Sequence, residues 1–593
     1  MFSLSPRSPL PHGGALPTLG LLGGLLCGLL LALPAAAAVS DSLRDRLAAG
    51  QDKIWIGPVA SSDRAVLDEF YAARGDAPVW IGADGAPVDK ARQLSRVLLN
   101  AGEHGLEPAH YEAGRIAELL DSEDEAALAE LELRLSLALI RFASDLDSGR
   151  LDPRRVDPEH YSYPQDVDRA AVLPGSLEAQ DIWVYLRAFQ PQQNEYERLK
   201  GALAHYRSLA EGGGWDPIPE GETLKEGMSD PRVPALRQRL LLLGDLEPSE
   251  SRADTEQAAA AAENTADTVE LPQADPTMAA PTDEPPAAAE GEAGPPEQLY
   301  TPVLIEAVKR FQHRHGLTED GVVGPKTLEA LNVPAETRVE QMVMNMERRR
   351  WMPDDRGDRY IFVNLANFDA KLVDGLDTVF HTKVVVGAPY HRTPVFSDVM
   401  TYLEINPVWN VPESIARKEL LPKIQEDPNY LAERNYTLLM SWDQNAPEVN
   451  PLSIDWNEIT AGSFPFRIRQ EAGENNALGR IKFMFPNQFN IYLHDTPARS
   501  LFSRTERAFS HGCIRVAKPL ELAAAVLEGQ GDWNLERVAE AVESGVTQRV
   551  NLERPLPVQL TYITAWVNKD GTVHFRRDVY GRDRTLARAL FGP

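Results

Sequence analysis

The sequence predicts a multidomain α+β protein. Its 593 residues correspond to about three or four folded units at the usual domain size. Leu and Ala recur at helical spacing through the first part of the chain, whereas short alternating or β-branched runs, separated by Gly, Pro and Asp, begin at Arg359. The hydrophobic fraction of 43% and the charged fraction of 25% are ordinary for globular proteins, so most of the chain has enough apolar surface to fold.

The N-terminal segment has the pattern of a secretory signal. An apolar run from Leu19 to Leu33 follows Arg7 and precedes Pro34 and the small residues Ala35 to Ala38. A bilayer span usually needs ~20 apolar residues, so this run is short for an anchor. We interpret residues 1–38 as the signal peptide of an exported protein. The alternative is an uncleaved anchor, which would be the chain's sole contact with a membrane.

Charge excludes one class of partner. The formal net charge of −28 argues against a nucleic-acid partner, because nucleic acids are bound by clusters of Lys and Arg. Residues 248–298 alone carry twelve carboxylates, one basic residue and no aromatic residue. This composition predicts a disordered acidic insert, and the folded remainder is less acidic than the total suggests.

Residues 39–225 are predicted to form a helical domain. Within Ala127 to Ser148 the apolar residues follow the 3.6-residue period, as in Leu128, Leu131 and Leu135. The charged residues of this region have no spacing that demands chemistry. A structural role for the domain follows.

A small helical module is predicted at residues 226–335, interrupted by the acidic insert. Helical patterns at Pro231 to Gly244 and Thr301 to Asn332 flank the insert, and Gly-containing pairs mark tight turns. The string AVKRFQHRHGLTEDGVVGPKTLEALN resembles the peptidoglycan-binding domain family, a three-helix module. The resemblance implies a peptidoglycan ligand, and a helical linker without a ligand is the alternative.

Residues 336–555 are predicted to form a mainly β domain, with residues 556–593 as its C-terminal extension. Runs such as Tyr360 to Leu365 and Thr401 to Ile405 have the β-branched and aromatic content of strands. A polar, helical stretch at about residues 415–470 interrupts them. We interpret it as an inserted helix and long loop that serves as a lid.

The chemistry is predicted at His494 and Cys513. Without the signal peptide, which contains Cys27, Cys513 is the sole cysteine of an exported chain. A thiol becomes a strong nucleophile when an imidazole takes its proton. In an extended segment, His511, Cys513 and Arg515 would point to one side, and amide groups near Gly512 would donate to an oxyanion. This arrangement predicts acyl transfer through a thioester.

Two other interpretations fit a cysteine with nearby histidines. One is a packed structural thiol with hydrogen-bonded imidazoles. The other is a metal site made from His511, Cys513 and His494, but no paired Cys spacing or H-E-x-x-H helix accompanies them. We therefore expect neither a metal nor another cofactor.

The complete string HDTPARSLFSRTERAFSHGCIRVAKP, together with VVVGAPYHRTPVFSDVMTYLEINPVWNVPESIARKELLPKI upstream, resembles the L,D-transpeptidase family in its long, Gram-negative form. The resemblance implies a helical scaffold domain, a peptidoglycan-binding module and a mainly β catalytic domain in one exported, periplasmic chain. It implies Cys513 as the nucleophile and His494 as the general base. It also implies a backbone carbonyl rather than the Asp495 side chain as the group that orients His494. The remaining implied site residues are Gly512 in the oxyanion region, His511 in polarising or positioning the substrate, and Arg515, Ser510, Tyr492 and Trp409 in substrate binding.

The reaction implied by the family begins with attack on the L-centre carbonyl of diaminopimelate in a peptidoglycan tetrapeptide stem, with release of D-alanine. An amine acceptor would give a 3→3 cross-link and water would give carboxypeptidase activity, and the sequence leaves both open. The resemblance also implies inactivation by carbapenems and other wall-synthesis enzymes as partners. A cysteine endopeptidase or amidase, and a non-catalytic wall-binding scaffold, are the rival functions. The order of His494 before Cys513 argues against a papain-like peptidase.

Overall fold

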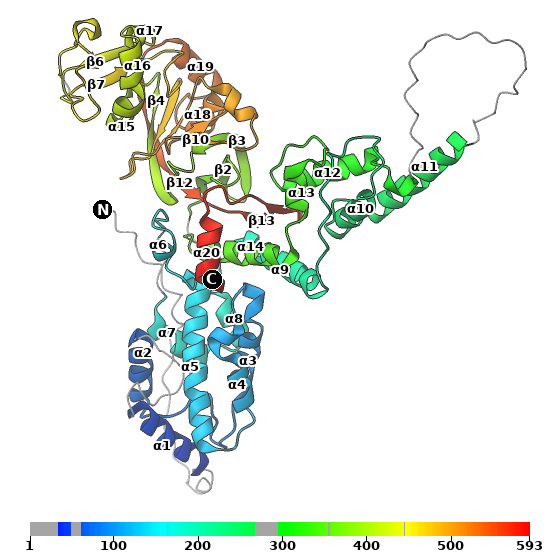
Figure 1. The fold of residues 1–593 in the computed structure, drawn as a ribbon. Coiled ribbons are helices and arrows are strands. Elements are labelled where there is room, and N and C mark those ends of the chain that lie inside the picture. Colours follow the sequence, from blue (N-terminus) through cyan, green and yellow to red (C-terminus); the bar gives the residue numbers. More distant parts are fainter. Residues whose placement is uncertain are drawn as a thin grey trace, which may run out of the picture. The chain divides into compact units, whose positions relative to one another are not determined.

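The computed structural model describes residues 34–48, 61–162, 164, 167–266, 295–353, 356–443 and 445–592 (Figure 1). Most of the predicted signal peptide lies outside these residues, and the predicted cleavage point before Val39 falls within α1 (Pro34–Ala48). Two compact units divide the chain: one contains the residues up to Arg92 with Arg115–Leu137, and the other contains Gln93–Gly114 with Ala138–Pro593. No helix among the described residues has the length and apolar character needed to cross a membrane.

The first unit is helical and is organised around a buried carboxylate. It contains α2 (Ser61–Ala72) and the first half of α5 (Glu125–Ser148). Glu132 is fully buried and accepts hydrogen bonds from the Trp80 amide (2.8 Å) and the Tyr71 hydroxyl (2.8 Å). Burial raises the pKa of Glu132 to about 7. The carboxylate joins α5 to the segment that follows α2.

The helices that follow continue the predicted helical domain. They are α3 (Asp89–Leu99), α4 (Ala113–Leu119), α6 (Pro153–Val156), α7 (Arg169–Glu178), α8 (Ile182–Arg187) and α9 (Asn194–Glu211), with short turns at Ala101–His104 and Pro108–Tyr111. Tyr196, Leu199 and Leu203 of α9 share one core with α14 (Ala335–Arg350) and Phe575. A segment predicted to belong to the scaffold thus packs with the C-terminal half of the chain.

The small module contains α10 (Val233–Leu242), α11 (Pro248–Ala266), α12 (Pro302–Arg314), α13 (Pro325–Leu331) and a short turn at Pro296–Gln298. Its helices bury one apolar core that includes Leu236, Leu304 and Phe311. The prediction of disorder throughout residues 248–298 is wrong for its first third, because α11 is helical there. Its Ala-rich sequence has high helix propensity, and its Asp254 accepts a hydrogen bond from Thr301 (2.8 Å). Residues 267–294 lie outside the described part.

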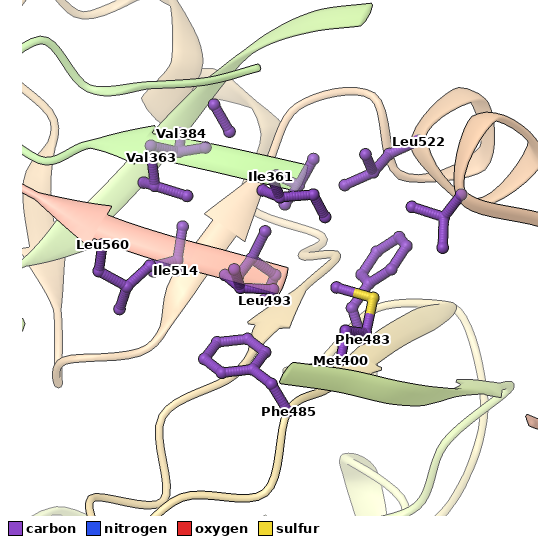
Figure 2. Packing of buried hydrophobic residues seen from close by; sticks show 14 of the residues in the cluster. Ile361, Val363, Val384, Met400, Phe483, Phe485, Leu493, Ile514, Leu522 and Leu560 are labelled. Atoms are coloured by element: carbon purple, nitrogen blue, oxygen red, sulfur yellow. The ribbon is translucent and has the colours of Figure 1, made fainter. Parts of the chain in front are cut away.

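The predicted mainly β domain is built on a sheet with the order β10-β3-β11-β9-β8-β4-β12-β1-β2 in the described residues, and β2 also pairs with β3. This extra pairing closes the sheet on itself. Its strands are β1 (Arg359–Asn364), β2 (Asp369–Asp374), β3 (Asp377–Gly387), β4 (Phe396–Ile405), β8 (Ile481–Met484), β9 (Leu493–His494), β10 (Ala508–Ser510), β11 (Ile514–Val516) and β12 (Gln548–Thr561). Figure 2 shows the core, where Ile361, Met400, Phe483 and Leu493 are packed together with Leu522 of α18 (Pro519–Leu527). The helix α19 (Leu535–Glu543) contributes Val538 to the same core.

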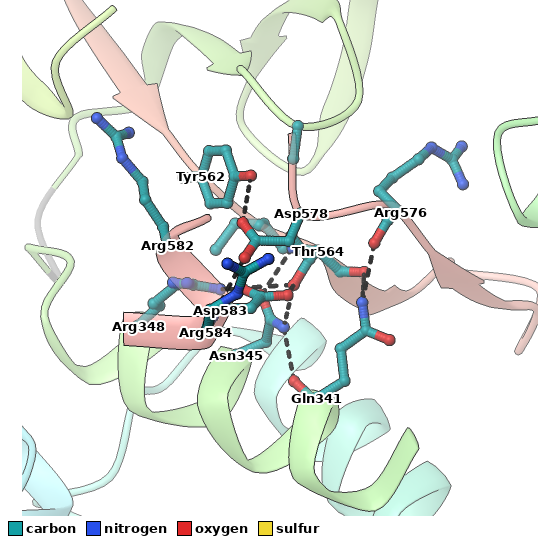
Figure 3. A network of polar contacts seen from close by, with 12 residues as sticks. Gln341, Asn345, Arg348, Tyr562, Thr564, Arg576, Asp578, Arg582, Asp583 and Arg584 are labelled. Atoms are coloured by element: carbon teal, nitrogen blue, oxygen red, sulfur yellow. Dashed lines mark hydrogen bonds and ion pairs between the residues drawn. The ribbon is translucent and has the colours of Figure 1, made fainter. Parts of the chain in front are cut away.

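The boundary predicted at residue 555 falls inside β12. This long strand lies between β4 and β1, so residues 556–561 form part of the main sheet rather than an extension of it. The chain continues through β13 (Ala565–Val567), β14 (Val573–Phe575) and α20 (Arg582–Phe591). Figure 3 shows how a polar network joins α14 to this segment. Arg348 of α14 forms an ion pair with Asp583 of α20 (2.5 Å), and Asp583 also accepts from Thr564 (2.8 Å).

The predicted lid is more ordered than a helix and a loop. It contains α15 (Glu413–Ile415), a π-helical turn at Ala416–Leu420, α16 (Leu421–Glu426), α17 (Tyr430–Glu433), β6 (Tyr436–Leu439), a turn at Pro451–Ser453 and β7 (Arg467–Gln470). With β5 (Trp409–Asn410) it forms a three-stranded antiparallel sheet. Its helices and sheet enclose a separate core that includes Leu420, Ile424, Trp456 and Ile468. This insertion is therefore a small subdomain.

Candidate functional site

Two adjacent parallel strands bring the predicted nucleophile and base together. In the register of β9 and β11, Leu493 lies opposite Ile514 and His494 lies opposite Arg515. Leu493 and Ile514 are fully buried in the core. Because side chains alternate along a strand, His494 and Arg515 lie on the other face of the sheet. Cys513, which directly precedes Ile514, faces the same way.

His494 is held as a neutral base. The backbone carbonyl of Asp495 lies 2.5 Å from its Nδ1. A carbonyl only accepts, so Nδ1 carries the proton and Nε2 keeps its lone pair. Burial, reinforced by the positive charge of Arg515, lowers the pKa of His494 to about 3. The imidazole is therefore able to accept a proton at neutral pH.

The Asp495 carboxylate has other partners. It accepts hydrogen bonds from the backbone amides of Arg480 (2.8 Å) and Thr496 (2.6 Å) and pairs with Arg499 (2.5 Å). The group that orients His494 is thus the main-chain carbonyl, as the family resemblance implies.

The thiol of Cys513 lies beside Tyr492. Burial raises the pKa of the Cys513 thiol, while the amide and hydroxyl groups of Tyr492 donate hydrogen bonds to the sulfur and oppose that rise. The Tyr492 hydroxyl also receives a hydrogen bond from Trp409. The Cys513 thiol and the His494 imidazole, which share a face of the sheet, are thus both neutral at rest, and Tyr492 supplies hydrogen-bond donors for a thiolate. Tyr492 thus contacts the sulfur directly, and Trp409 contacts the Tyr492 hydroxyl.

The loop that carries the nucleophile is fixed by buried hydrogen bonds. Gly512 has φ +115°, a conformation that L residues rarely adopt. Ser510 is buried, donates to the Cys513 carbonyl (2.5 Å) and accepts from the Gly512 amide (3.1 Å). Ser510 therefore braces the loop and has no free hydroxyl donor for a substrate. Since the Gly512 amide is engaged, the Cys513 amide is the better placed oxyanion donor.

His511 and Arg515 have different surroundings. The Nε2 of His511 lies 2.6 Å from Glu419 in the inserted subdomain, and both side chains are about 40% exposed. Arg515 is half-buried, and within the described structure its Nε has no hydrogen-bond partner. The Arg515 side chain lies on the site side of the sheet, and a guanidinium group suits a carboxylate. The described residues contain no cluster of three or more His, Cys, Asp or Glu side chains able to hold a metal ion.

The sequence interpretation did not include Lys482 and Thr393. Lys482 lies opposite His494 in the pairing of β8 with β9, and its Nζ is 4.3 Å from the Tyr492 ring centroid. The alternation of Ile481 and Phe483 with Lys482 would have placed this lysine away from the core. Thr393 donates to the Gly512 carbonyl (2.7 Å). No sequence signal identifies that contact, because 119 positions separate the two residues.

The closed β-sheet with a thiol and an imidazole on one face defines the class of this protein: a multidomain α+β chain with a cysteine–histidine site. Comparison with known families gives matches to the "Scaffold domain" at residues 65–203, the "Putative peptidoglycan binding domain" at 288–331 and the "L,D-transpeptidase catalytic domain" at 358–539. Residues 358–539 thus match the family of L,D-transpeptidase catalytic domains, and two further segments match a scaffold domain and a peptidoglycan-binding domain. The predicted family and fold class are confirmed.

One curated protein and two solved structures are similar to parts of this chain. A protein of Haemophilus influenzae named "Putative L,D-transpeptidase" is 39% identical over 247 residues, which make up 42% of this chain and 49% of that protein. The chain thus spans about half the length of the curated relative it matches. An L,D-transpeptidase from Mycobacterium smegmatis is 11% identical, covering 34% of this chain and 58% of that one with a TM-score of 0.17. An L,D-transpeptidase from Xylanimonas cellulosilytica is 14% identical, covering 58% and 100% of the two chains with a TM-score of 0.17.

Proposed function

We propose that this protein is a peptidoglycan L,D-transpeptidase that forms 3→3 cross-links through a thioester on Cys513. The observation that carries the proposal is the shared sheet face of Cys513 and His494, with Tyr492 donating to the sulfur. The N-terminal signal pattern and the peptidoglycan-binding match both fit an exported protein that acts in the periplasm. Other wall-synthesis enzymes would supply the tetrapeptide stems.

The proposed reaction has two acyl-transfer steps. His494 accepts the Cys513 proton through Nε2 as the sulfur attacks the L-centre carbonyl of diaminopimelate. The tetrahedral oxyanion lies near the Cys513 amide, and its collapse breaks the bond to D-alanine, whose amine receives the proton from His494. The amine of a second diaminopimelate then attacks the thioester, and the thiol is regenerated.

Substrate recognition is assigned to the cationic side of the site. The Arg515 guanidinium binds a stem carboxylate, while Trp409 and Tyr492 line the donor groove. Lys482 adds positive charge beside Tyr492. Carbapenems would acylate Cys513, because their strained carbonyl enters the same position.

The test is mass spectrometry of wild type and Cys513→Ala incubated with disaccharide tetrapeptides. We expect a wild-type thioester, released D-alanine and dimeric 3→3 product, all absent from the variant. D-alanine release without dimers would assign carboxypeptidase activity instead. Cleaved stems that retain D-alanine would assign a peptidase, and intact substrate that still binds would overturn the enzymatic proposal.

A further inference from the structure

A groove of about 530 Å³ lies between the peptidoglycan-binding module and the catalytic domain. One wall is formed by residues 312–327, which include the end of α12 and the start of α13. The other wall is formed by residues 366–369, His381 and Lys383 of β3, and the segments 503–507 and 576–579. This groove is separate from the residues assigned above to the thiol and imidazole.

The two walls are joined by specific contacts. Arg576 donates to the Asn367 side chain (2.6 Å) on one wall and to the Arg314 carbonyl (2.8 Å) at the other. Gly316 has φ +64°, and a Cβ there would lie 2.6 Å from Arg576 Cδ, so glycine is needed for this close approach. Thr318 and Thr505 share a hydrogen bond across the groove (2.9 Å). The walls are therefore preorganised rather than merely adjacent.

The lining reverses the charge balance of the chain. Six Lys and Arg residues line the groove against four Asp and Glu residues, whereas the whole chain has 60 against 88. Lys326, Lys383 and Arg504 are exposed, and none of them pairs with a carboxylate in the residues that the structure describes. Asp369, opposite Lys383 in the sheet, is bound to His381 instead (3.1 Å). The groove thus presents unneutralised cations, which favour an anionic ligand.

The groove begins on the sheet face that carries the nucleophile. Arg515 lies opposite Val385 in the pairing of β11 with β3, so Lys383, two residues from Val385, faces the same side as Arg515 and Cys513. Strand geometry places Lys383 roughly 14 Å from Cys513. An extended tetrapeptide spans roughly 13 Å. A stem bound in the groove is therefore close enough to Cys513 to belong to the same polymer as the stem that reacts there.

We infer that this groove is a second, non-catalytic peptidoglycan site, which binds the carboxylates of a stem neighbouring the one that is cut. This inference rests on the proposed function, because it concerns how the same substrate polymer is held. Lys326 and Lys383, on opposite walls, supply the charge. Binding there keeps the polymer at the enzyme between turnovers and raises its effective concentration at Cys513.

The experiment measures binding of full-length Cys513→Ala protein to purified sacculi, so that covalent capture plays no part. We expect Lys326→Glu/Lys383→Glu to weaken binding about tenfold, since two favourable charges become unfavourable. Binding by the unsubstituted groove should also fall as NaCl is raised. Sacculi stripped of stems by an amidase should bind weakly, because they lose the stem carboxylates and keep only the lactyl carboxylates that the amidase frees on the glycan.

The matched control is Lys225→Glu/Arg252→Glu, which makes the same charge change at exposed positions outside the groove. Equal binding by the groove and control variants, or undiminished binding to stripped glycan, overturns the inference. Melting temperatures equal to that of the parent show that both variants fold. Binding needs no turnover, so the two proposals can fail separately. If the groove variant loses binding but the wild type shows no activity, the proposed function is contradicted and the groove site is still supported.

Discussion

Two polar centres of this protein differ in how completely their side chains are paired with one another. In the network between α14 and the C-terminal segment, Arg348, Asp583 and Thr564 all engage one another (Figure 3). On the sheet face that carries Cys513 and His494, by contrast, the half-buried thiol and the buried imidazole are both neutral, and the Nε of Arg515 has no hydrogen-bond partner in the described residues. Complete pairing stabilises a fold, whereas groups left without full pairing are free to act on a substrate.

The strongest test of this contrast replaces the base. His494→Gln should lower kcat/KM for tetrapeptide by about 10²–10⁴-fold, because the proposed mechanism makes its Nε2 the acceptor of the thiol proton. The measurement is the initial rate of D-alanine release. His205→Gln, at an exposed position on α9, is the matched control and should retain the wild-type rate. An equal rate for both variants would remove His494 from the mechanism.

The same histidine gives a pH dependence with a defined sign. Its pKa falls from 6.5 to about 3 on folding, so the neutral imidazole contributes stability that is fully present above about pH 6.5 and is lost as the pH falls toward 3. Wild-type activity should therefore continue well below pH 6.5. His494→Gln should lose less stability than wild type over this acidic range, as followed by urea unfolding. An activity midpoint near 6.5 would contradict a buried neutral base.

Breaking the paired network should affect stability rather than chemistry. Asp583→Ala leaves the Arg348 charge buried and unpaired, at a cost of about 3–5 kcal/mol in the free energy of unfolding. Urea denaturation measures this, and D-alanine release by the folded fraction should be unchanged. Asp377→Ala, which breaks the exposed pair with Lys569, is the control and should unfold like wild type. Similar losses for both would mean that burial of the network contributes nothing.

A smaller effect is expected from Tyr492→Phe, which removes one donor to the sulfur. A hydrogen bond to a charged group contributes about 1.5–3 kcal/mol, so kcat should fall at least about tenfold. The pH midpoint of Cys513 alkylation by iodoacetamide should move upward, because the thiolate loses a donor. An unchanged alkylation profile would show that the hydroxyl does not act on the sulfur.

The smallest effect is expected at the inserted subdomain. Glu419→Gln weakens the contact with His511, and a pair about 40% exposed contributes at most about 1 kcal/mol. KM should rise by a few fold without a change in kcat. Glu413→Gln, which breaks a pair with Arg417 inside the subdomain, is the control and should leave KM unchanged. A fall in kcat for Glu419→Gln would place His511 in the chemistry instead.

The comparison with the sequence is instructive at particular residues. Residue types alone left several chemistries open for His494 and Cys513, and their roles as base and nucleophile, which the family resemblance implies, stay predictions; the structure shows that the two side chains share a face of the sheet. Ser510 could be predicted as a residue near the site, but the orientation of its hydroxyl could not. In the structure the buried hydroxyl donates to the Cys513 carbonyl within the loop. The Ala-rich α11 was predicted as disordered because acidic composition outweighed helix propensity, whereas contacts such as Asp254 with Thr301 fix it in the structure.

The sequence by itself determined the order of the domains and the family resemblance, and it singled out Cys513 and His494 as candidates, because local periodicity and short motifs carry that information. The tertiary structure decided which groups meet. The pairing of β9 with β11, the close contact of Gly316 with Arg576, and the place of β12 inside the main sheet join positions far apart in the chain. Such contacts depend on strand register and burial, which are properties of the whole fold.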